Sequence, residues 1–204
     1  MLDMLVVGGG YVGLAAAVAV KQAAPHLEVM VIEAAPADSW KKDSRASAII
    51  TAASKMLSVF GVWDEILPEA EPITKMIVTD SRPADPVRPV FLTFDGAATK
   101  GETFAHMVPN VAMVGALRAA CGRLGIAIRE GVSATDFKTG DTAVTLTLSD
   151  GSVLEAKLLV ACDGVKSKLR DMAGIRTVSS RASRIASSAK AGSPSASYPR
   201  VKSR

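Results

Sequence analysis

Val6-Val7-Gly8-Gly9-Gly10-Tyr11-Val12-Gly13 is the stretch of this chain that decides its fold. Gly8, Gly10 and Gly13 have the G-x-G-x-x-G spacing, and they lie between an apolar strand predicted over residues 3–7 and a helix predicted over residues 11–24. Gly8 allows a tight turn, Gly10 lets the backbone approach a pyrophosphate, and Gly13 lets the helix pack closely against the strand. Free N–H groups at the start of the helix favour phosphate, so the stretch predicts a dinucleotide-binding turn.

A second apolar strand, predicted over residues 28–33, completes a strand–helix–strand unit of the length that a parallel crossover needs. Glu33 ends this strand, where a carboxylate can accept hydrogen bonds from the ribose of an adenosine. An acid at this position disfavours a 2′-phosphate, so FAD or NAD is expected here rather than NADP. The structural alternative is a glycine turn without a ligand, with Glu33 as a solvated acid.

The rest of the chain alternates between predicted helices and strands, which places it in the α/β class. Helices are predicted over residues 49–60, 110–124 and 166–173, and strands over 73–79, 90–94, 126–128, 144–148, 153–154 and 158–162. Residues 34–44 and the proline-containing residues 80–89 are predicted to be loops. A nucleotide-binding parallel sheet followed by strands with one wet face is therefore expected.

The composition is that of a globular chain up to about Val178 and changes after it. From Ser179 to Arg204 there are nine Ser, six of the 24 Lys and Arg residues, and none of the 20 Asp and Glu residues. The formal net charge of +4 therefore comes from this tail, and it is not evidence that the body of the protein binds nucleic acid. We predict that residues 179–204 are disordered; the alternative is a basic arm that binds nucleic acid or anionic lipid.

Several functions are disfavoured by the same sequence. The uncharged run over residues 5–20 is short for a membrane span, is interrupted by three glycines, and has no Lys or Arg before it, so a cytoplasmic protein is predicted. Cys121 and Cys162 are predicted to be buried thiols. His26 and His106 are the only histidines, so no metal site is expected, and His106 is predicted to lie in a loop.

Asp43-Ser44-Arg45-Ala46-Ser47-Ala48-Ile49, followed by Met56-Leu57-Ser58-Val59-Phe60-Gly61-Val62-Trp63, resembles the D-x-R-x-x-A-I…L-x-x-x-G-x-W stretch of aromatic-ring flavoprotein hydroxylases. Within that group the chain is most similar to the ubiquinone-biosynthesis hydroxylases, and the match continues over residues 71–80. The resemblance implies FAD as the cofactor and places Arg45 near the flavin, where a guanidinium can bind phosphate or flavin oxygens. Taken alone, Arg45 is a surface cation in a loop.

Two further segments carry the resemblance. Asp163-Gly164-Val165-Lys166-Ser167-Lys168-Leu169-Arg170 resembles the family's D-G-x-x-S-x-x-R motif, which is associated with the flavin pyrophosphate and with the use of reduced pyridine nucleotide. In isolation, Asp163 is equally an N-cap residue and Gly164 a turn residue. Asn110 lies in a segment that in the family commonly reads Glu-Asn or Arg and contributes to the flavin site. In this chain Pro109 replaces the acid. The alternative role of Asn110 is that of a helix N-cap.

The resemblance implies a fold, an activity and partners. It covers about residues 3–178 and predicts a Rossmann-like FAD-binding domain over 1–178, with part of a mixed or antiparallel substrate-domain sheet around 71–109. The implied activity is FAD- and NAD(P)H-dependent hydroxylation, by molecular oxygen, of an aromatic ring on a polyprenylated phenol or quinol precursor of ubiquinone. A peripheral membrane or biosynthetic-complex association follows from the lipid-soluble substrate. No side chain is assigned as catalytic.

Family members also carry a later Gly-Asp motif that binds the ribityl chain, more of the substrate sheet, and a C-terminal helical region. We expect neither this motif nor these regions in the present sequence. Together with the change of composition after Val178, this expectation favours a frameshift followed by early termination. An intact reading frame shared with homologues would contradict the frameshift. A non-catalytic flavin-binding fragment is the alternative function. An NAD-dependent Rossmann enzyme of another kind is a third, against which the match over residues 43–63 argues.

Overall fold

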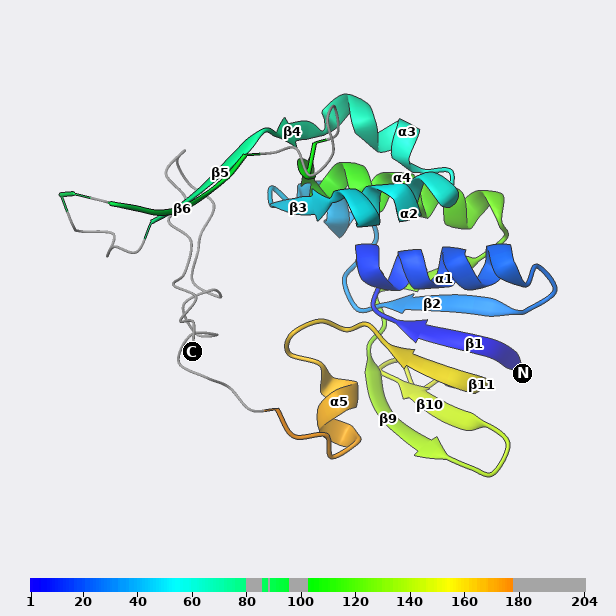
Figure 1. The fold of residues 1–204 in the computed structure, drawn as a ribbon. Coiled ribbons are helices and arrows are strands. Elements are labelled where there is room, and N and C mark those ends of the chain that lie inside the picture. The colour runs from blue at the N-terminus through cyan, green and yellow to red at the C-terminus, as the bar shows by residue number, and fades with distance from the viewer. Residues whose placement is uncertain (80–85, 88, 96–102, 178–204) are drawn as a thin grey trace.

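A six-stranded mixed sheet forms the centre of the computed structural model, which describes residues 1–79, 86–87, 89–95 and 103–177 (Figure 1). The strand order is β8-β2-β1-β11-β10-β9, and β8, β2, β1 and β11 are parallel to one another, whereas β11, β10 and β9 are antiparallel. The strands are β1 (Leu2–Val7), β2 (Val29–Glu33), β8 (Ala127–Glu130), β9 (Ala134–Thr139), β10 (Val144–Leu148) and β11 (Val153–Ala161). The predicted α/β class is confirmed.

The central strand β1 is covered on both faces, which explains its continuous apolar sequence. Met4 and Val6 pack in one core cluster, beneath the helices α1 (Tyr11–Ala23) and α4 (Asn110–Arg123). Leu5 and Val7 point the other way, into a second cluster built from β9, β10 and α5 (Lys168–Met172). Figure 1 shows α1 and α4 on one side of the sheet and α5 on the other.

The structure joins two predicted strands, 153–154 and 158–162, into the single strand β11. Glu155 and Lys157 interrupt the apolar run, but both lie on the exposed side of the strand. Ala156, between them, is fully buried and pairs with both Leu2 of β1 and Val144 of β10. The polar residues are therefore the outward half of a period-two pattern and do not end the strand.

A smaller antiparallel sheet lies beside the helices, with the order β3-β7-β4. It consists of β3 (Ala46–Ile50), β7 (Ala105–Pro109) and β4 (Glu71–Ile73), and next to it lie α2 (Thr51–Val59), α3 (Trp63–Ile66) and the short 3-10 helix η2 (Leu67–Glu69). The helix predicted from Ile49 is wrong at its start, because Ile49 and Ile50 pair with His106 and Ala105 in this sheet. His106 accordingly lies on a strand and not in a loop.

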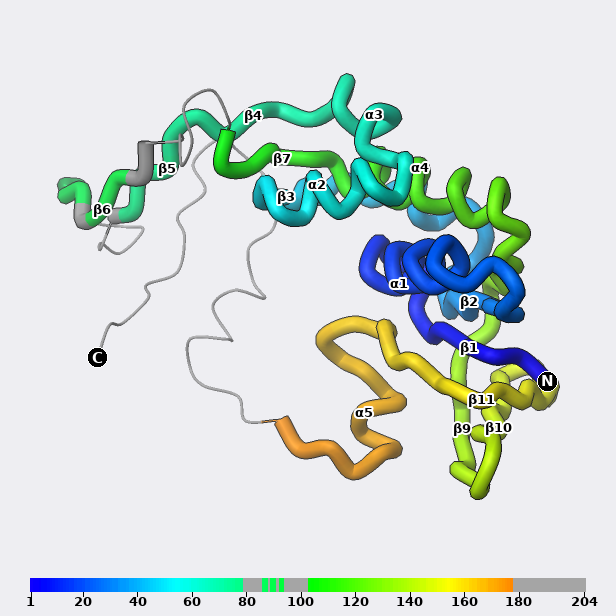
Figure 2. Tube along the Cα trace, turned by 45° about the vertical axis from the view of Figure 1, so that its right-hand side comes forward, coloured from blue at the N-terminus to red at the C-terminus, as the bar shows by residue number. Residues whose placement is uncertain are grey.

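The predicted strand 73–79 is divided at Thr74 into β4 and β5 (Lys75–Thr79). β5 pairs with β6 (Val90–Asp95) in a hairpin that projects away from the body of the molecule (Figure 2). The predicted loop over 34–44 contains a 3-10 helix, η1 (Ser39–Lys42). The tail over 179–204 and most of the predicted loop over 80–89 lie outside the described residues.

Within the described ranges, no helix is both long and apolar enough to cross a membrane, and no group of His, Cys, Asp and Glu side chains is arranged to hold a metal ion. Cys121 is buried and Cys162 is half-buried, and both are free thiols. Burial raises the pKa of the Cys121 thiol to about 11. Partial burial, followed by the charge of Asp163, raises the pKa of Cys162.

Candidate dinucleotide site

The glycine turn between β1 and α1 is packed against backbone atoms too closely for side chains at two of its positions. Gly8 has a φ of +119°, and a Cβ there would lie 2.1 Å from the carbonyl oxygen of Cys162. A Cβ on Gly13 would lie 2.0 Å from the carbonyl oxygen of Gly8. Gly10 differs, since no described residue beyond its own neighbours in the chain lies within 4 Å of the position of its Cβ, so its backbone faces open space. The turn is thus in close contact with the protein backbone at Gly8 and Gly13, and it is open at Gly10.

Glu33 connects the end of β2 to this turn. Its Oε2 accepts a hydrogen bond of 2.7 Å from the N–H of Gly9, and its Oε1 accepts one of 2.8 Å from the N–H of Ala35. The carboxylate is therefore held in one orientation. Each of its oxygens keeps a further lone pair for a ligand hydroxyl.

A cavity of about 350 Å³ lies beside the glycine turn, at the carboxyl ends of β1 and β11. Five of the eight predicted cofactor residues line it: Gly8, Gly10, Glu33, Asp163 and Gly164. They come from three separate segments of the chain. The carboxyl edge of a parallel sheet is where ligands bind in open α/β folds, so we refer to this space as the dinucleotide cavity.

Asp163 is fixed from one side only. Its Oδ2 accepts hydrogen bonds from the N–H groups of Lys168, at 2.7 Å, and Leu169, at 3.3 Å. Its Oδ1 is buried and has no hydrogen-bond partner among the residues that the structure describes. Partial burial would raise the pKa of Asp163, but hydrogen bonds from Ser167 and from these backbone groups outweigh it and lower the pKa.

The N-cap residue of α5 is Ser167, whose hydroxyl accepts a hydrogen bond of 3.0 Å from the N–H of Arg170. Asp163 therefore supports the start of α5 without being its N-cap residue. Gly164 has a φ of +87°, a conformation that side chains rarely adopt, which agrees with its predicted place in a turn.

Arg45 lines a neighbouring cavity of about 310 Å³, which shares Gly10 and Glu33 with the dinucleotide cavity. Its Nε and Nη2 donate to Oδ1 and Oδ2 of Asp43, both at 2.8 Å. This pair holds the pKa of Asp43 well below its usual range and raises the pKa of Arg45. The Arg45 side chain is three-quarters exposed, and the flavin contact expected of it stays a prediction.

Asn110 is not the N-cap residue of α4, and that alternative is wrong. Pro109 holds the cap position, and the Asn110 side chain reaches across to the strand segment instead. Its Oδ1 accepts from Ser47 Oγ at 2.7 Å, its Nδ2 donates to Asp43 Oδ2 at 3.2 Å, and its backbone N–H donates to the carbonyl of Arg45 at 2.9 Å. Asn110 is buried and positions the Asp43–Arg45 segment.

Sequence reasoning missed Arg118 and Trp40, which also line the cavity beside Arg45. The Arg118 guanidinium lies 5.5 Å from the centre of the Trp40 ring and 2.9 Å from Glu130. A signal was present, because Asn110 and Arg118 are separated by eight residues, two steps of four along one helix face. The dinucleotide cavity has two further missed residues, Lys166 and Lys168.

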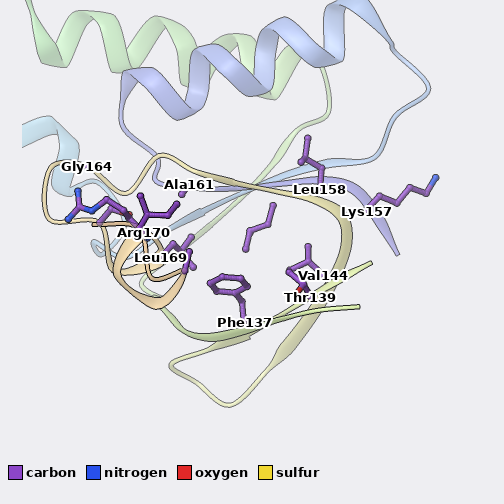
Figure 3. Close-up of a pocket in the computed structure, with 13 residues that line it drawn as sticks. Phe137, Thr139, Val144, Lys157, Leu158, Ala161, Gly164, Leu169 and Arg170 are labelled. Carbon is purple, nitrogen blue, oxygen red and sulfur yellow. The ribbon is translucent and has the colours of Figure 1, made fainter. Parts of the chain in front are cut away.

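Another cavity, of about 670 Å³, lies between α5 and the strands β9–β11 (Figure 3). Figure 3 shows Phe137, Leu158 and Leu169 around it, with Gly164 and Arg170 at one end. No residue of the glycine turn lines it, and its walls are mainly apolar. It is therefore a separate space that meets the dinucleotide cavity at Gly164.

A glycine turn at the first crossover, an acid at the end of the second strand, and a cavity at the carboxyl edge of the sheet define a dinucleotide-binding α/β domain. The sequence profile described as FAD binding domain matches residues 1–195, and the chain belongs to that family. FAD is thus the cofactor that goes with this domain.

Two curated relatives are hydroxylases that act on ubiquinone or 3-demethoxyubiquinol, by their names. The chain is 35% identical over 179 residues to ubiquinone hydroxylase UbiL of Rhodospirillum rubrum, covering 85% of this chain and 39% of the relative. It is 33% identical over 179 residues to 3-demethoxyubiquinol 3-hydroxylase of Escherichia coli, covering 85% and 44%. The chain thus spans about two-fifths of the length of these relatives.

Solved structures share the fold. p-Nitrophenol 4-monooxygenase PnpA from Pseudomonas putida matches with a TM-score of 0.71 and 23% identity, over 85% of this chain and 44% of that one. Aklavinone-11 hydroxylase, solved as a ternary complex with FAD and aklavinone, matches with a TM-score of 0.67 and 28% identity, over 85% and 35%.

Proposed function

We propose that this chain binds FAD in the dinucleotide cavity and belongs to a monooxygenase that hydroxylates the aromatic ring of a ubiquinone precursor. The observation that carries the first part is the convergence of Gly8, Gly10, Glu33, Asp163 and Gly164 on one cavity from three segments of the chain. The second part is supported by the names of the relatives, which are hydroxylases of ubiquinone or of 3-demethoxyubiquinol.

The residues around the cavity fit the adenosine diphosphate part of FAD. The open space above Gly10 admits a diphosphate next to free backbone N–H groups. Glu33 keeps acceptor capacity for the hydroxyls of a ribose. The buried, unpartnered Oδ1 of Asp163 is an acceptor for which a ligand hydroxyl would be the natural donor, because a buried acceptor left alone costs free energy.

Arg45 and Asn110 are proposed to act together at the neighbouring cavity. Asn110 fixes Asp43, and Asp43 fixes the guanidinium of Arg45. Bound FAD would bring oxygen and electron chemistry, with NAD(P)H as the reductant and molecular oxygen as co-substrate. The residues of this chain would bind and orient the cofactor, and we assign none of them a proton transfer.

We extend the proposal to organisation and location. Residues 1–178 would form the FAD-binding domain, and the antiparallel strands between 71 and 109 would belong to the substrate side of the enzyme. A polyprenylated substrate is lipid-soluble, which supports association with a membrane surface or a biosynthetic complex. Binding of the purified protein to liposomes, with and without a polyprenyl phenol, would test the membrane part.

The first experiment is the visible absorption spectrum of the purified protein after addition of FAD and desalting. Retained flavin absorbance in the wild type and its loss in Gly10→Val, which fills the open space above the turn, would support the proposal. The control is Gly122→Ala on α4, whose added Cβ would have no neighbour within 4 Å among the described residues outside its own helix turns, so this variant should retain FAD. A wild type that keeps its fold by circular dichroism but retains no flavin would contradict it.

A further inference from the structure

Four charged side chains line the dinucleotide cavity: Glu33, Asp163, Lys166 and Lys168. Both acids are held in place by backbone N–H groups, Glu33 by Gly9 and Ala35 and Asp163 by Lys168 and Leu169. These hydrogen bonds keep both carboxylates at the wall of the cavity. Two fixed negative charges therefore lie beside the space in which a diphosphate would have to bind.

The two lysines are placed differently. Both are exposed, and neither ammonium group makes an ion pair or a side-chain hydrogen bond with any residue in the described part of the chain. Arg170, two residues further on, is by contrast occupied by Asp171 and by the carbonyl of Val165. Among the described residues, Lys166 and Lys168 are thus cations without an acidic partner, on the wall of a cavity that is also lined by two acids.

The glycine turn supplies no positive side chain of its own, since the chain carries no Lys or Arg between Val6 and Val20. Without the lysines the charged lining of the cavity sums to −2, and with them it is neutral. A diphosphate carries about two negative charges, so its entry into a site lined by acids alone would be opposed by like charge.

We propose that Lys166 and Lys168 bind the diphosphate of the dinucleotide and set its affinity. The inference rests on the proposed FAD site and adds the groups that compensate charge there. Lys166 and Lys168 occupy two of the unspecified positions of the D-G-x-x-S-x-x-R pattern, so this is a property of the present chain and is not implied by its motif. Mobile ammonium groups suit the task, because they can follow the phosphates from several directions.

The test measures the dissociation constants of FAD, ADP and adenosine for the full chain and for the double variant Lys166→Gln/Lys168→Gln. Two exposed charge contacts predict that the variant binds FAD and ADP roughly fivefold to tenfold more weakly at low salt. Adenosine, which has no phosphate, should bind both proteins equally. The dependence of FAD affinity on salt should also be shallower in the variant.

Two controls separate charge from shape. Lys138→Gln removes an exposed lysine on β9 that does not line the cavity, and it should leave all three affinities unchanged. Lys166→Arg/Lys168→Arg keeps the charge and should retain most of the affinity for FAD.

The outcomes distinguish this proposal from the one on which it rests. If the wild type binds FAD and the glutamine variant binds it equally tightly, the role of the lysines is overturned and the FAD site stands. An equal loss of affinity for adenosine would also overturn it, because the variant would then have altered the shape of the cavity. A folded wild type that binds neither FAD nor ADP would overturn both proposals.

Discussion

The carboxylate of Glu33 accepts a hydrogen bond of 2.7 Å from the backbone N–H of Gly9. This contact joins the end of the second strand to the turn after the first, and a Cβ on Gly9 would lie 2.9 Å from the same carboxylate. The acid proposed to bind ribose therefore also shapes the glycine turn. Its two roles predict two separate consequences of mutation.

Glu33→Gln should lower both stability and FAD affinity. One of the two backbone N–H groups, that of Gly9 or that of Ala35, would face an amide N–H₂ in place of an oxygen, which costs about 1–3 kcal/mol. Urea unfolding gives the loss of stability, and fluorescence titration gives the affinity. Glu155→Gln, on the exposed side of β11, is the matched control and should change neither.

Gly13→Ala should be strongly destabilising, by about 3 kcal/mol or more, because the added Cβ meets backbone and a rigid turn cannot move aside. Gly122→Ala adds the same methyl group to α4 in open space and should stabilise the protein by about 0.5–1 kcal/mol. The difference between the two free energies of unfolding is the measurement. Equal effects would mean that α1 is not packed against the turn as described.

Arg45→Ala should weaken FAD binding about tenfold while leaving stability within about 1 kcal/mol, because the Arg45 side chain of this ion pair is mostly exposed. Lys41→Ala, which removes another exposed ion pair nearby, should leave FAD affinity unchanged. Unaltered binding by the Arg45 variant would remove Arg45 from the site.

The Asp43–Arg45 pair should make stability depend on acid pH. Arg45 holds the pKa of Asp43 below its ordinary value of 3.8 in the folded chain, so the unfolded chain takes up a proton first as the pH falls. The stabilisation is complete above about pH 5 and declines as the pH falls below about 4. Asp43→Asn should flatten this part of the pH profile modestly, and its effect should be smaller in an Arg45→Ala background, where the hydrogen bonds from the backbone N–H of residue 45 and from Asn110 remain.

Bound FAD should protect Cys162 from alkylation, since Cys162 lines the dinucleotide cavity. Cys121 is buried and its pKa is raised to about 11, so it should not react in the folded protein at pH 8. Mass spectrometry after iodoacetamide treatment identifies the labelled residue. Equal labelling of Cys162 with and without FAD would place the ligand elsewhere.

The first crossover could be predicted from sequence because its signals are local: an apolar strand, three spaced glycines, a helix and a second apolar strand lie within the first 33 residues. β3, β7 and β9 were missed for different reasons. Ile49 and Ile50 of β3 run directly into α2, so an apolar run was assigned to the helix alone. β7 contains a histidine and a proline, and β9 is an edge strand with mostly exposed residues, so neither shows a clear alternation.

The candidate site likewise contains residues that local motifs predict and residues whose role depends on distant contacts. The motifs predict eight cofactor residues, and the structure brings five of them together in the dinucleotide cavity. The role of Asn110 could not be read from sequence, because its partners Ser47 and Asp43 are 63 and 67 residues away along the chain. The sequence around Asn110 indicates only contacts with neighbouring residues, and an N-cap is such a contact.

The position of β11 has a consequence for synthesis of the protein on the ribosome. β1 lies between β2 and β11. At the end of β11 the N–H of Cys162 donates a hydrogen bond to the carbonyl of Val7, and the carbonyl of Cys162 packs against Gly8. During synthesis, one edge of β1 therefore has no strand partner until residues 153–164 have left the ribosomal exit tunnel. Pairing partners so distant in sequence make folding slow, so cofactor loading should follow translation of this segment and cannot guide the folding of the first crossover.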